Sequence, residues 1–89
     1  MATPTIKRAG QIREWAGGVI VKYRELSGFS QMELARRLGV SQPLVSSWEC
    51  GRLTPSIWDI TRLEQVLNTE QGEMLLQIAY PKAPRDAGN

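Results

Sequence analysis

Residues 30–52, SQMELARRLGVSQPLVSSWECGR, determine how the rest of the chain is arranged. Ser30 and Glu33 have the spacing of a capping box, in which each side chain bonds the other residue's backbone N–H at a helix N-terminus. Good helix formers follow, and Gly39 is of the residue type that most often ends a helix in the left-handed conformation. The first half of the stretch therefore predicts a short helix that begins after Ser30 and ends before Gly39.

The second half of the stretch predicts another short helix. Ser41 is a suitable N-cap, and Pro43 is tolerated in the first turn because an N–H there has no intrahelical partner. Gly51 marks the end of this helix. The two helices are expected to share one core, formed by Leu34, Ala35, Leu38, Val45 and Trp48.

A longer helix is expected upstream of this stretch. Apolar residues at three- and four-residue steps predict an amphipathic helix over residues 11–27. Gly17 and Gly18 are unfavourable inside a helix, and we expect them to permit the close approach of another helix. The apolar stripe contains Ile12, Trp15, Ala16, Val19, Ile20, Tyr23 and Leu26.

Two more helices are expected downstream. Ser56 and Asp59 form a second capping box, which predicts the start of a fourth helix. A fifth helix is expected over residues 70–79, before Tyr80 and Pro81. No run with the two-residue period of a strand is long enough to predict a sheet. The buried stripe of the fourth helix is expected to contain Ile57, Ile60, Leu63 and Leu67.

A set of polar, apolar and glycine positions occurs together in and just after the opening stretch: Gln31, Glu33, Leu34, Ala35, Leu38, Gly39, Val40, Ser41, Gln42, Val45, Ser46, Trp48, Glu49, Gly51 and Pro55. This set resembles the helix-turn-helix of the phage Cro and repressor class, the xenobiotic-response-element family. The resemblance implies an all-α, compact five-helix, lambda-repressor-like DNA-binding domain at residues 11–80, with its motif at 30–52. A generic helical hairpin is the alternative, but it does not account for the small polar residues on one face of the second motif helix.

The composition fits one globular domain of 89 residues, with 42% hydrophobic and 22% charged residues. Residues 1–53 contain eight basic and four acidic residues, so their net charge is +4. Residues 54–89 contain three basic and five acidic residues, so their net charge is −2. A polyanion such as DNA is therefore expected to meet the N-terminal half of the chain.

Several classes of function lack the residues that they need. The sequence has no histidine and only one cysteine, Cys50, so the usual zinc ligand sets and an internal disulfide are missing. It has no glycine-rich phosphate loop and no evident acid–base arrangement, so we expect no enzyme, no cofactor and no small-molecule ligand. We see no membrane span and no signal peptide, and the single cysteine suits a reducing compartment, so we expect a cytoplasmic protein without a membrane partner.

The second motif helix offers residues that can read DNA if it enters the major groove. Gln42 has a donor and an acceptor, which suit N7 and N6 of adenine. Leu44 can pack on a thymine methyl group, whereas Ser46 and Ser47 can donate or accept and discriminate less. The resemblance implies base reading at the positions of Gln42, Pro43, Ser46 and Ser47. Pro43 cannot make the hydrogen bond that a polar residue of many relatives makes there.

Phosphate contacts are expected beside this helix. The resemblance implies a phosphate clamp at Gln31, assisted by the positive end of its helix dipole. Ser41, Arg37 and Arg52 are further candidates. The alternative for each of the two arginines is a solvated surface charge.

The two ends of the chain are expected to be irregular. Residues 1–10 are expected to form a flexible basic arm, in which Lys7 and Arg8 contact DNA phosphates or a minor groove. The alternative for this arm is a frayed, solvated terminus. Residues 81–89 are rich in proline and glycine and are expected to form a disordered tail.

The acidic second half of the chain is expected to supply a dimer contact. A two-fold dimer places two recognition helices in successive major grooves, about 34 Å apart. The interface residues that we expect are Trp58, Met74, Leu75 and Ile78. The alternative for Leu75 and Ile78 is that they close the core of the monomer.

The residues and the resemblance together predict a sequence-specific transcriptional regulator that binds double-stranded DNA. The first interpretation is a phage Cro-like or immunity repressor that binds a two-fold operator as a homodimer, because the chain ends soon after the motif domain. An antitoxin or a restriction-control autoregulator of the same fold is an alternative. A helical protein-interaction module without DNA binding is another, although the charge asymmetry and the polar helix face argue against it.

Overall fold

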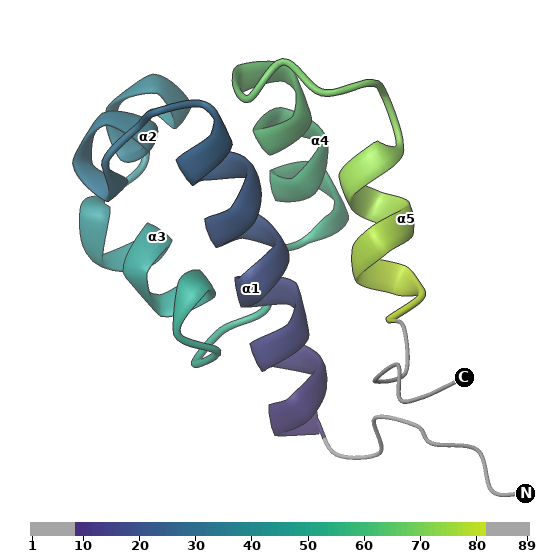
Figure 1. The fold of residues 1–89 in the computed structure, drawn as a ribbon. Coiled ribbons are helices and arrows are strands. Elements are labelled where there is room, and N and C mark those ends of the chain that lie inside the picture. Colours follow the sequence, from purple (N-terminus) through teal and green to yellow (C-terminus); the bar gives the residue numbers. More distant parts are fainter. Residues whose placement is uncertain (1–8, 82–89) are drawn as a thin grey trace, which may run out of the picture.

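The computed structural model describes residues 9–81, and every regular element in this range is an α-helix (Figure 1). The elements are α1 (Ala9–Leu26), α2 (Gln31–Leu38), α3 (Gln42–Glu49), α4 (Ile57–Val66) and α5 (Glu73–Ala79). These five helices, with no strand among residues 9–81, confirm the all-α five-helix prediction. Residues 1–8 and 82–89, where most of the predicted arm and tail fall, lie outside the described residues.

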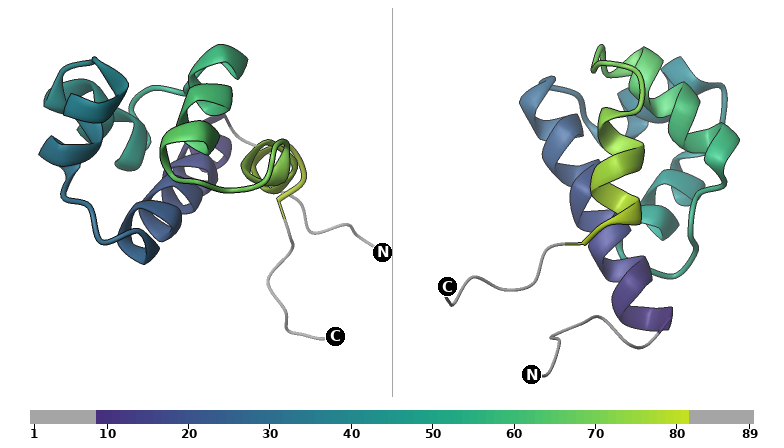
Figure 2. Two further views of the ribbon diagram at one scale, coloured as in Figure 1. Left: turned by 90° about the horizontal axis from the view of Figure 1, so that it is seen from above. Right: turned by 90° about the vertical axis from the view of Figure 1, so that its right-hand side faces the viewer.

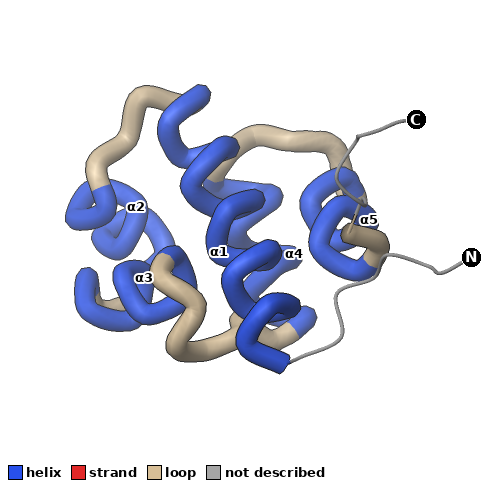
Figure 3. Tube along the Cα trace, turned by 60° about the horizontal axis from the view of Figure 1, so that its bottom comes forward, coloured by secondary structure: helices blue, strands red, loops and turns tan. Residues whose placement is uncertain are grey.

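Helix α1 runs between the α2–α3 pair and α5, and it packs against both α3 and α5 (Figure 1). Helix α4 contacts α2 and α5 and so closes the ring of helices. The connection between α2 and α3 is a tight turn, at which Gly39 has a φ of +75°, whereas a longer loop joins α3 to α4 (Figure 3). Helix α3 therefore lies at the edge of the domain, held by α1 and α2.

The hydrophobic core lies where the helices meet, and all five contribute to it. Trp48 is only 2% exposed and Val45 is fully buried, which confirms the predicted inward face of α3. Burial of these side chains provides the main favourable free energy of folding. The buried apolar residues are Ala16, Val19, Ile20, Tyr23, Leu34, Ala35, Leu38, Val45, Trp48, Ile60, Leu63, Leu67, Met74 and Ile78.

Four residues of the predicted apolar stripes are not among these buried residues, and one of them, Trp15, is partly buried and packs against the core. Ile12, Leu26 and Ile57 are exposed, so the prediction that they are buried is wrong. Each lies in the first or last turn of its helix, where fewer neighbouring helices lie alongside. Helical periodicity therefore predicts the inward side of a helix, but not how far along the helix its neighbours reach.

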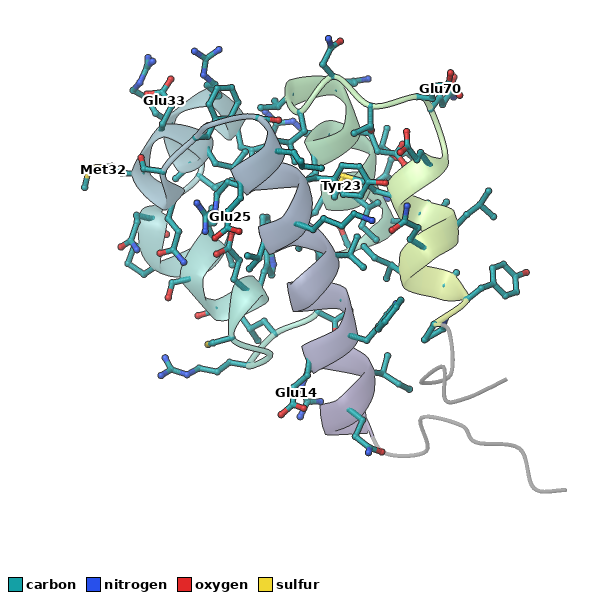
Figure 4. The ribbon with its side chains drawn as sticks, in the orientation of Figure 1. Glu14, Tyr23, Glu25, Met32, Glu33 and Glu70 are labelled. Atoms are coloured by element: carbon teal, nitrogen blue, oxygen red, sulfur yellow. The ribbon has the colours of Figure 1, made fainter. Side chains whose placement is uncertain are left out.

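The two predicted capping boxes differ. The box that begins at Ser56 is complete, with both reciprocal hydrogen bonds formed. At the start of α2, Ser30 accepts a hydrogen bond of 2.9 Å from the backbone N–H of Glu33, but the return half of the prediction is wrong. The Glu33 carboxylate instead accepts hydrogen bonds from Arg36 and Arg37, since these cations lie one turn further along the same helix. Figure 4 shows Glu33 on the outer side of α2.

Helix α3 is fixed at both ends. At its N-terminus, the Ser41 hydroxyl accepts a hydrogen bond of 3.3 Å from the backbone N–H of Leu44. At its C-terminus, a Cβ atom added to Gly17 of α1 would lie 2.5 Å from the carbonyl oxygens of Trp48 and Glu49. The expected close approach of another helix is therefore confirmed at Gly17, where no larger residue fits without a backbone shift.

Helix α5 begins later than predicted and is capped from another helix. It starts at Glu73 rather than at residue 70, after Gly72 with a φ of +89° and no side-chain cap of its own. The two carboxylate oxygens of Glu64 in α4 accept hydrogen bonds from the backbone N–H groups of Gly72 and Leu75, at 2.9 and 3.0 Å. Seen from the side of α5, the short helix lies across α1 (Figure 2, right). A buried carboxylate thus ties α5 to α4.

Candidate nucleic-acid interface

The outer side of α3 brings together four of the five residues that we expected to read bases, whereas the fifth, Leu44, also packs against the core. Because Val45 and Trp48 face the core, Ser46 and Ser47 between them, and Gln42 and Pro43 one turn earlier, lie on the other side of the helix. Pro43 is exposed, and Gln42, Leu44, Ser46 and Ser47 are half-buried. Helix α3 therefore presents one amide, two hydroxyls and the ring of Pro43 on its outer side.

Gln42 is joined to the start of the preceding helix. Its Nε2 donates a hydrogen bond of 2.7 Å to Oε1 of Gln31, which is the first residue of α2. The N-termini of both motif helices are thus linked through two amide side chains. Oε1 of Gln42 has no hydrogen-bond partner among the described residues, so this acceptor is available to a ligand.

Behind this pair lies a buried ion pair that the sequence did not lead us to expect. Arg24 of α1 makes two hydrogen bonds, of 2.6 and 3.1 Å, to the carboxylate of Glu49, whose side chain is 5% exposed. These hydrogen bonds raise the pKa of Arg24, although its burial acts in the opposite direction. Nε2 of Gln31 donates to Oε1 of Glu49 at 2.8 Å. The end of α3, the start of α2 and the last turn of α1 are therefore connected by one hydrogen-bond network.

The arrangement matches that of known proteins. A family model described as a helix-turn-helix domain matches residues 10–76 of this chain. The chain belongs to the helix-turn-helix domain family. In this family context, α2 and α3 are the two helices of the motif, and α3 is the helix that enters the major groove in such proteins.

Solved structures of helix-turn-helix regulators have the same fold. The clp gene regulator ClgR from C. glutamicum is 26% identical, with a TM-score of 0.71 over 83% of this chain and 96% of that chain. The hypothetical transcription factor NHTF from Neisseria is 21% identical, with a TM-score of 0.67 over 97% of this chain and 92% of that chain. No curated protein matches the chain at a significant level. The protein thus has the fold of these transcription regulators.

The predicted phosphate contacts surround this helix-turn-helix. Ser41 and Arg52 are exposed at the two ends of α3. Arg37 is paired with Glu33 at 2.6 Å, and its guanidinium lies 4.5 Å from the ring centroid of Phe29. Because the charge of Arg37 already has a carboxylate partner, Arg52 is the freer of the two candidate arginines.

Two predicted positions fall elsewhere. Lys7 and Arg8 lie outside the described residues, so their predicted DNA contacts stay a prediction. Met32, which the sequence analysis did not single out, is exposed and points away from the domain beside Gln31 (Figure 4).

The predicted dimer residues divide into two groups. Trp58 is 77% exposed and accessible at the surface, whereas Leu75 is half-buried and packs against the core. Met74 is 0% exposed and Ile78 is buried, so the prediction that they form a dimer contact is wrong. Both point from α5 into the core, which is the alternative that we had considered for Ile78.

Other exposed apolar residues are better placed than Met74 and Ile78. Leu53 and Ile57 are exposed in the segment that leads to Trp58. Leu76 and Tyr80 are exposed on α5 and at its end.

No helix within residues 9–81 is long and apolar enough to cross a membrane.

Proposed function

We propose that this protein is a sequence-specific transcriptional regulator that inserts α3 into the major groove of double-stranded DNA. The main observation behind the proposal is the hydrogen bond between Gln42 and Gln31. It holds the amide of Gln42 at the start of α3, where the amide can contact a base edge. A helix fits the major groove with its leading residues against the base edges. The helix-turn-helix family and the basic N-terminal half support the same function.

In this proposal the side chains of α3 have separate roles. Gln42 accepts from N6 and donates to N7 of adenine, the bidentate contact that glutamine makes best. Leu44 packs on a thymine methyl group, and Ser46 and Ser47 bond base edges with less discrimination. Pro43 contributes shape and no hydrogen bond.

Phosphate contacts fix the position of the protein on the duplex in this proposal. The backbone N–H of Gln31 lies at the positive end of α2, where a phosphate oxygen is stabilised. Arg52 and Ser41 bind phosphates at the two ends of α3, and Arg37 does so while it shares its charge with Glu33. Each such contact adds affinity without sequence preference.

We propose further that two copies bind a two-fold operator. The dimer contact would use Trp58 with its exposed neighbours Leu53 and Ile57, which lie before and in the first turn of α4. Exposed tryptophan is favoured in the centre of protein interfaces. Such a dimer would place its recognition helices about 34 Å apart.

Within this class, the resemblance of the motif supports a repressor of the phage Cro or immunity type, acting on DNA in the cytoplasm. The competing protein-interaction module predicts no affinity for duplex DNA. A salt titration with random duplex separates the two, because binding driven by phosphates weakens steeply as salt rises. Absence of binding at low salt would contradict a DNA-binding function.

Selection of bound sequences from a random DNA pool tests the reading role of α3. The Gln42→Ala variant is expected to lose about 1–3 kcal/mol of affinity for the best site and to lose its preference at one base pair. Gln65→Ala is the matched control, because it removes the same amide from an exposed position of α4 outside the motif. If Gln42→Ala lowers binding to all sequences equally, Gln42 does not read a base.

The dimer proposal has its own test. Trp58→Glu is expected to keep the thermal melting curve of the wild type and to abolish cooperative occupancy of two half-sites. Gln65→Glu, an exposed change later in α4, is the control for added charge. A single protein chain on the full operator in sedimentation, or wild-type cooperativity in Trp58→Glu, would exclude this interface.

A further inference from the structure

The hydrogen bonds behind the recognition helix form a series that ends at the proposed base-reading residue. Arg24 holds the carboxylate of Glu49, with N–O distances of 2.6 and 3.1 Å. Oε1 of Glu49 accepts from Nε2 of Gln31 at 2.8 Å. Oε1 of Gln31 accepts from Nε2 of Gln42 at 2.7 Å. Four side chains from three helices are therefore connected in a fixed order.

The chemistry of the groups dictates the direction of every bond in this series. An ionised carboxylate only accepts, so Gln31 must turn its NH₂ group toward Glu49. The Gln31 oxygen then faces Gln42, which must turn its own NH₂ group toward Gln31. Neither amide can be reversed without placing two acceptors or two donors against each other. The orientation of Gln42 thus follows from the negative charge of Glu49.

We infer that Arg24 and Glu49, which are largely buried and behind the reading face, act as positioning residues that determine which base Gln42 prefers. The inference rests on the proposed function, since it assumes that Gln42 reads a base edge. Arg24 contributes by holding the Glu49 carboxylate in place with two hydrogen bonds. Gln31 transmits the direction from Glu49 to Gln42.

As a consequence, the amide of Gln42 presents its donor and its acceptor in a fixed order on the protein surface that would face DNA. The nitrogen of Gln42 lies on the side of Gln31, and its oxygen lies on the far side. Adenine offers an acceptor at N7 and a donor at N6, so only one order of the two atoms pairs with it at a given position. A glutamine that rotates freely presents both orders and discriminates less.

Replacement of the carboxylate by an amide is expected to reverse this order. In Glu49→Gln, the amide oxygen must face Arg24, because a guanidinium only donates. The amide nitrogen then faces Gln31, which turns its oxygen toward residue 49 and its nitrogen toward Gln42. Gln42 consequently turns its oxygen toward Gln31 and presents the opposite order to the base. A change of preferred base distinguishes this effect from a loss of folding, which weakens binding to all sequences.

The experiment is to select bound sequences from a random DNA pool with the whole chain and then to measure affinities for the four bases at the position read by Gln42. The wild type is expected to prefer one base by roughly tenfold or more, as a good bidentate contact does. Glu49→Gln is expected to prefer a different base at that position. Gln31→Met, which interrupts the series and keeps the Arg24–Glu49 pair, is expected to reduce the preference to about threefold or less.

Two controls separate positioning from structure. Glu33→Gln makes the same chemical change in a carboxylate that pairs with Arg36 and Arg37 outside the series, and it is expected to keep the base preference. In a Gln42→Ala background, Glu49→Gln is expected to change no preference at this position. Preferences at the other positions are expected to stay as in the wild type in every variant.

The possible outcomes separate a failure of the proposed function from a failure of the positioning role of Arg24 and Glu49. If the wild type selects no sequence, the proposed function fails. If Gln42→Ala removes a preference while Gln31→Met and Glu49→Gln retain it, the positioning role alone is wrong. If Glu49→Gln does not fold, because the charge of Arg24 loses its partner, Gln31→Met decides the question by itself. An unchanged preference in Gln31→Met then overturns the inference.

Discussion

Helices α3 and α5 both pack on α1, on different sides, yet different kinds of contact hold them (Figures 1 and 3). Helix α3 has its own cap at Ser41, buries Trp48, and lies against the backbone at Gly17. Helix α5 has a glycine at its N-cap and depends on the carboxylate of Glu64.

Polar side chains also connect α5 to α1. Nε1 of Trp15 donates to the backbone carbonyl of Gln77 at 2.6 Å, and the Tyr23 hydroxyl donates to Glu73 at 2.7 Å. The Gln77 amide donates in turn to the Tyr23 hydroxyl. A local cap, packing and the Arg24–Glu49 ion pair thus fix α3 and leave its outer side free for a ligand, whereas α5 has no side-chain cap of its own and takes its N-terminal cap from Glu64 of α4. The two helices should respond differently to mutation and to pH.

The largest expected effect concerns the packing of α3. Trp48→Ala removes a side chain that is 2% exposed, so the free energy of unfolding should fall by about 3–5 kcal/mol. A small domain has only about 5–15 kcal/mol in total, so a large loss of thermal stability is expected. Trp58→Ala is the matched control, because the same change at an exposed residue should alter stability by less than about 0.5 kcal/mol. Similar melting temperatures for both variants would contradict a packing role for Trp48.

The next effect concerns the cap of α5. Glu64→Ala removes an acceptor with two backbone partners, so the free energy of unfolding should fall by about 1.5–3 kcal/mol. Hydrogen exchange should speed up most in the α5 amides, notably at Leu75, and less in α3. Gln65→Ala, at the exposed neighbouring position of α4, should leave exchange unchanged. Equal acceleration in α3 and α5 would mean that α5 does not depend on Glu64 in particular.

Two adjacent glycines of α1 provide a sharper test of the α3 contact. Gly17→Ala forces α3 away from α1, because the new Cβ would lie 2.5 Å from backbone oxygens, and should cost about 1–3 kcal/mol. At Gly18 nothing lies within 4 Å of an added Cβ, so Gly18→Ala should stabilise the helix by about 0.5–1 kcal/mol. Denaturant unfolding of both variants measures the difference. The expected result is a loss of stability for Gly17→Ala and a gain for Gly18→Ala. A gain in stability for Gly17→Ala would contradict the close approach of α3 to the backbone of α1 at this residue.

The contrast between α3 and α5 also explains what the sequence could predict. The existence of the motif helices follows from local signals, such as Ser41 and Gly39, and from apolar spacing that puts Trp48 inside. These signals act within a few residues and are therefore readable without a structure. The same signals identified Gln31 and Gln42 as candidate DNA contacts, although not the hydrogen bond between them.

The missed features depend on residues that are distant in sequence. Arg24 and Glu49 pair across 25 residues, and Glu64 caps a helix that starts nine residues later, so no local pattern indicates either contact. Met74 and Ile78 share a helix face that the spacing does identify. Whether that face meets the core or a second protein depends on how the loop after α4 turns, and the sequence does not specify that direction.

The smallest expected effect is the pH dependence of the α5 attachment. The hydrogen bond from Tyr23, followed by one from the backbone of Glu70, holds the pKa of Glu73 below its ordinary value of 4.5, and Lys22 acts in the same direction. The native state therefore binds this proton more weakly than the unfolded state does. The resulting stabilisation is present above pH 4.5 and is lost as the pH falls through the lowered pKa.

Burial, and then the carboxylate of Glu73, raises the pKa of Tyr23 above its ordinary value of 10.0. Its contribution to stability is present below pH 10.0 and is lost as the pH rises through the raised pKa. Tyr23→Phe keeps the ring and removes the hydroxyl, so it should be less stable than the wild type at neutral pH. The stability difference between the two proteins should shrink in acid and again in alkali, as measured by urea unfolding across pH. Hydrogen bonds from Arg36 and Arg37 also lower the pKa of Glu33, so Glu33 makes stability depend on pH in acid as well. To remove this second dependence, the Tyr23 protein and the Tyr23→Phe variant should both contain Glu33→Gln. A stability difference that does not vary with pH would contradict a proton-linked contact between Tyr23 and Glu73.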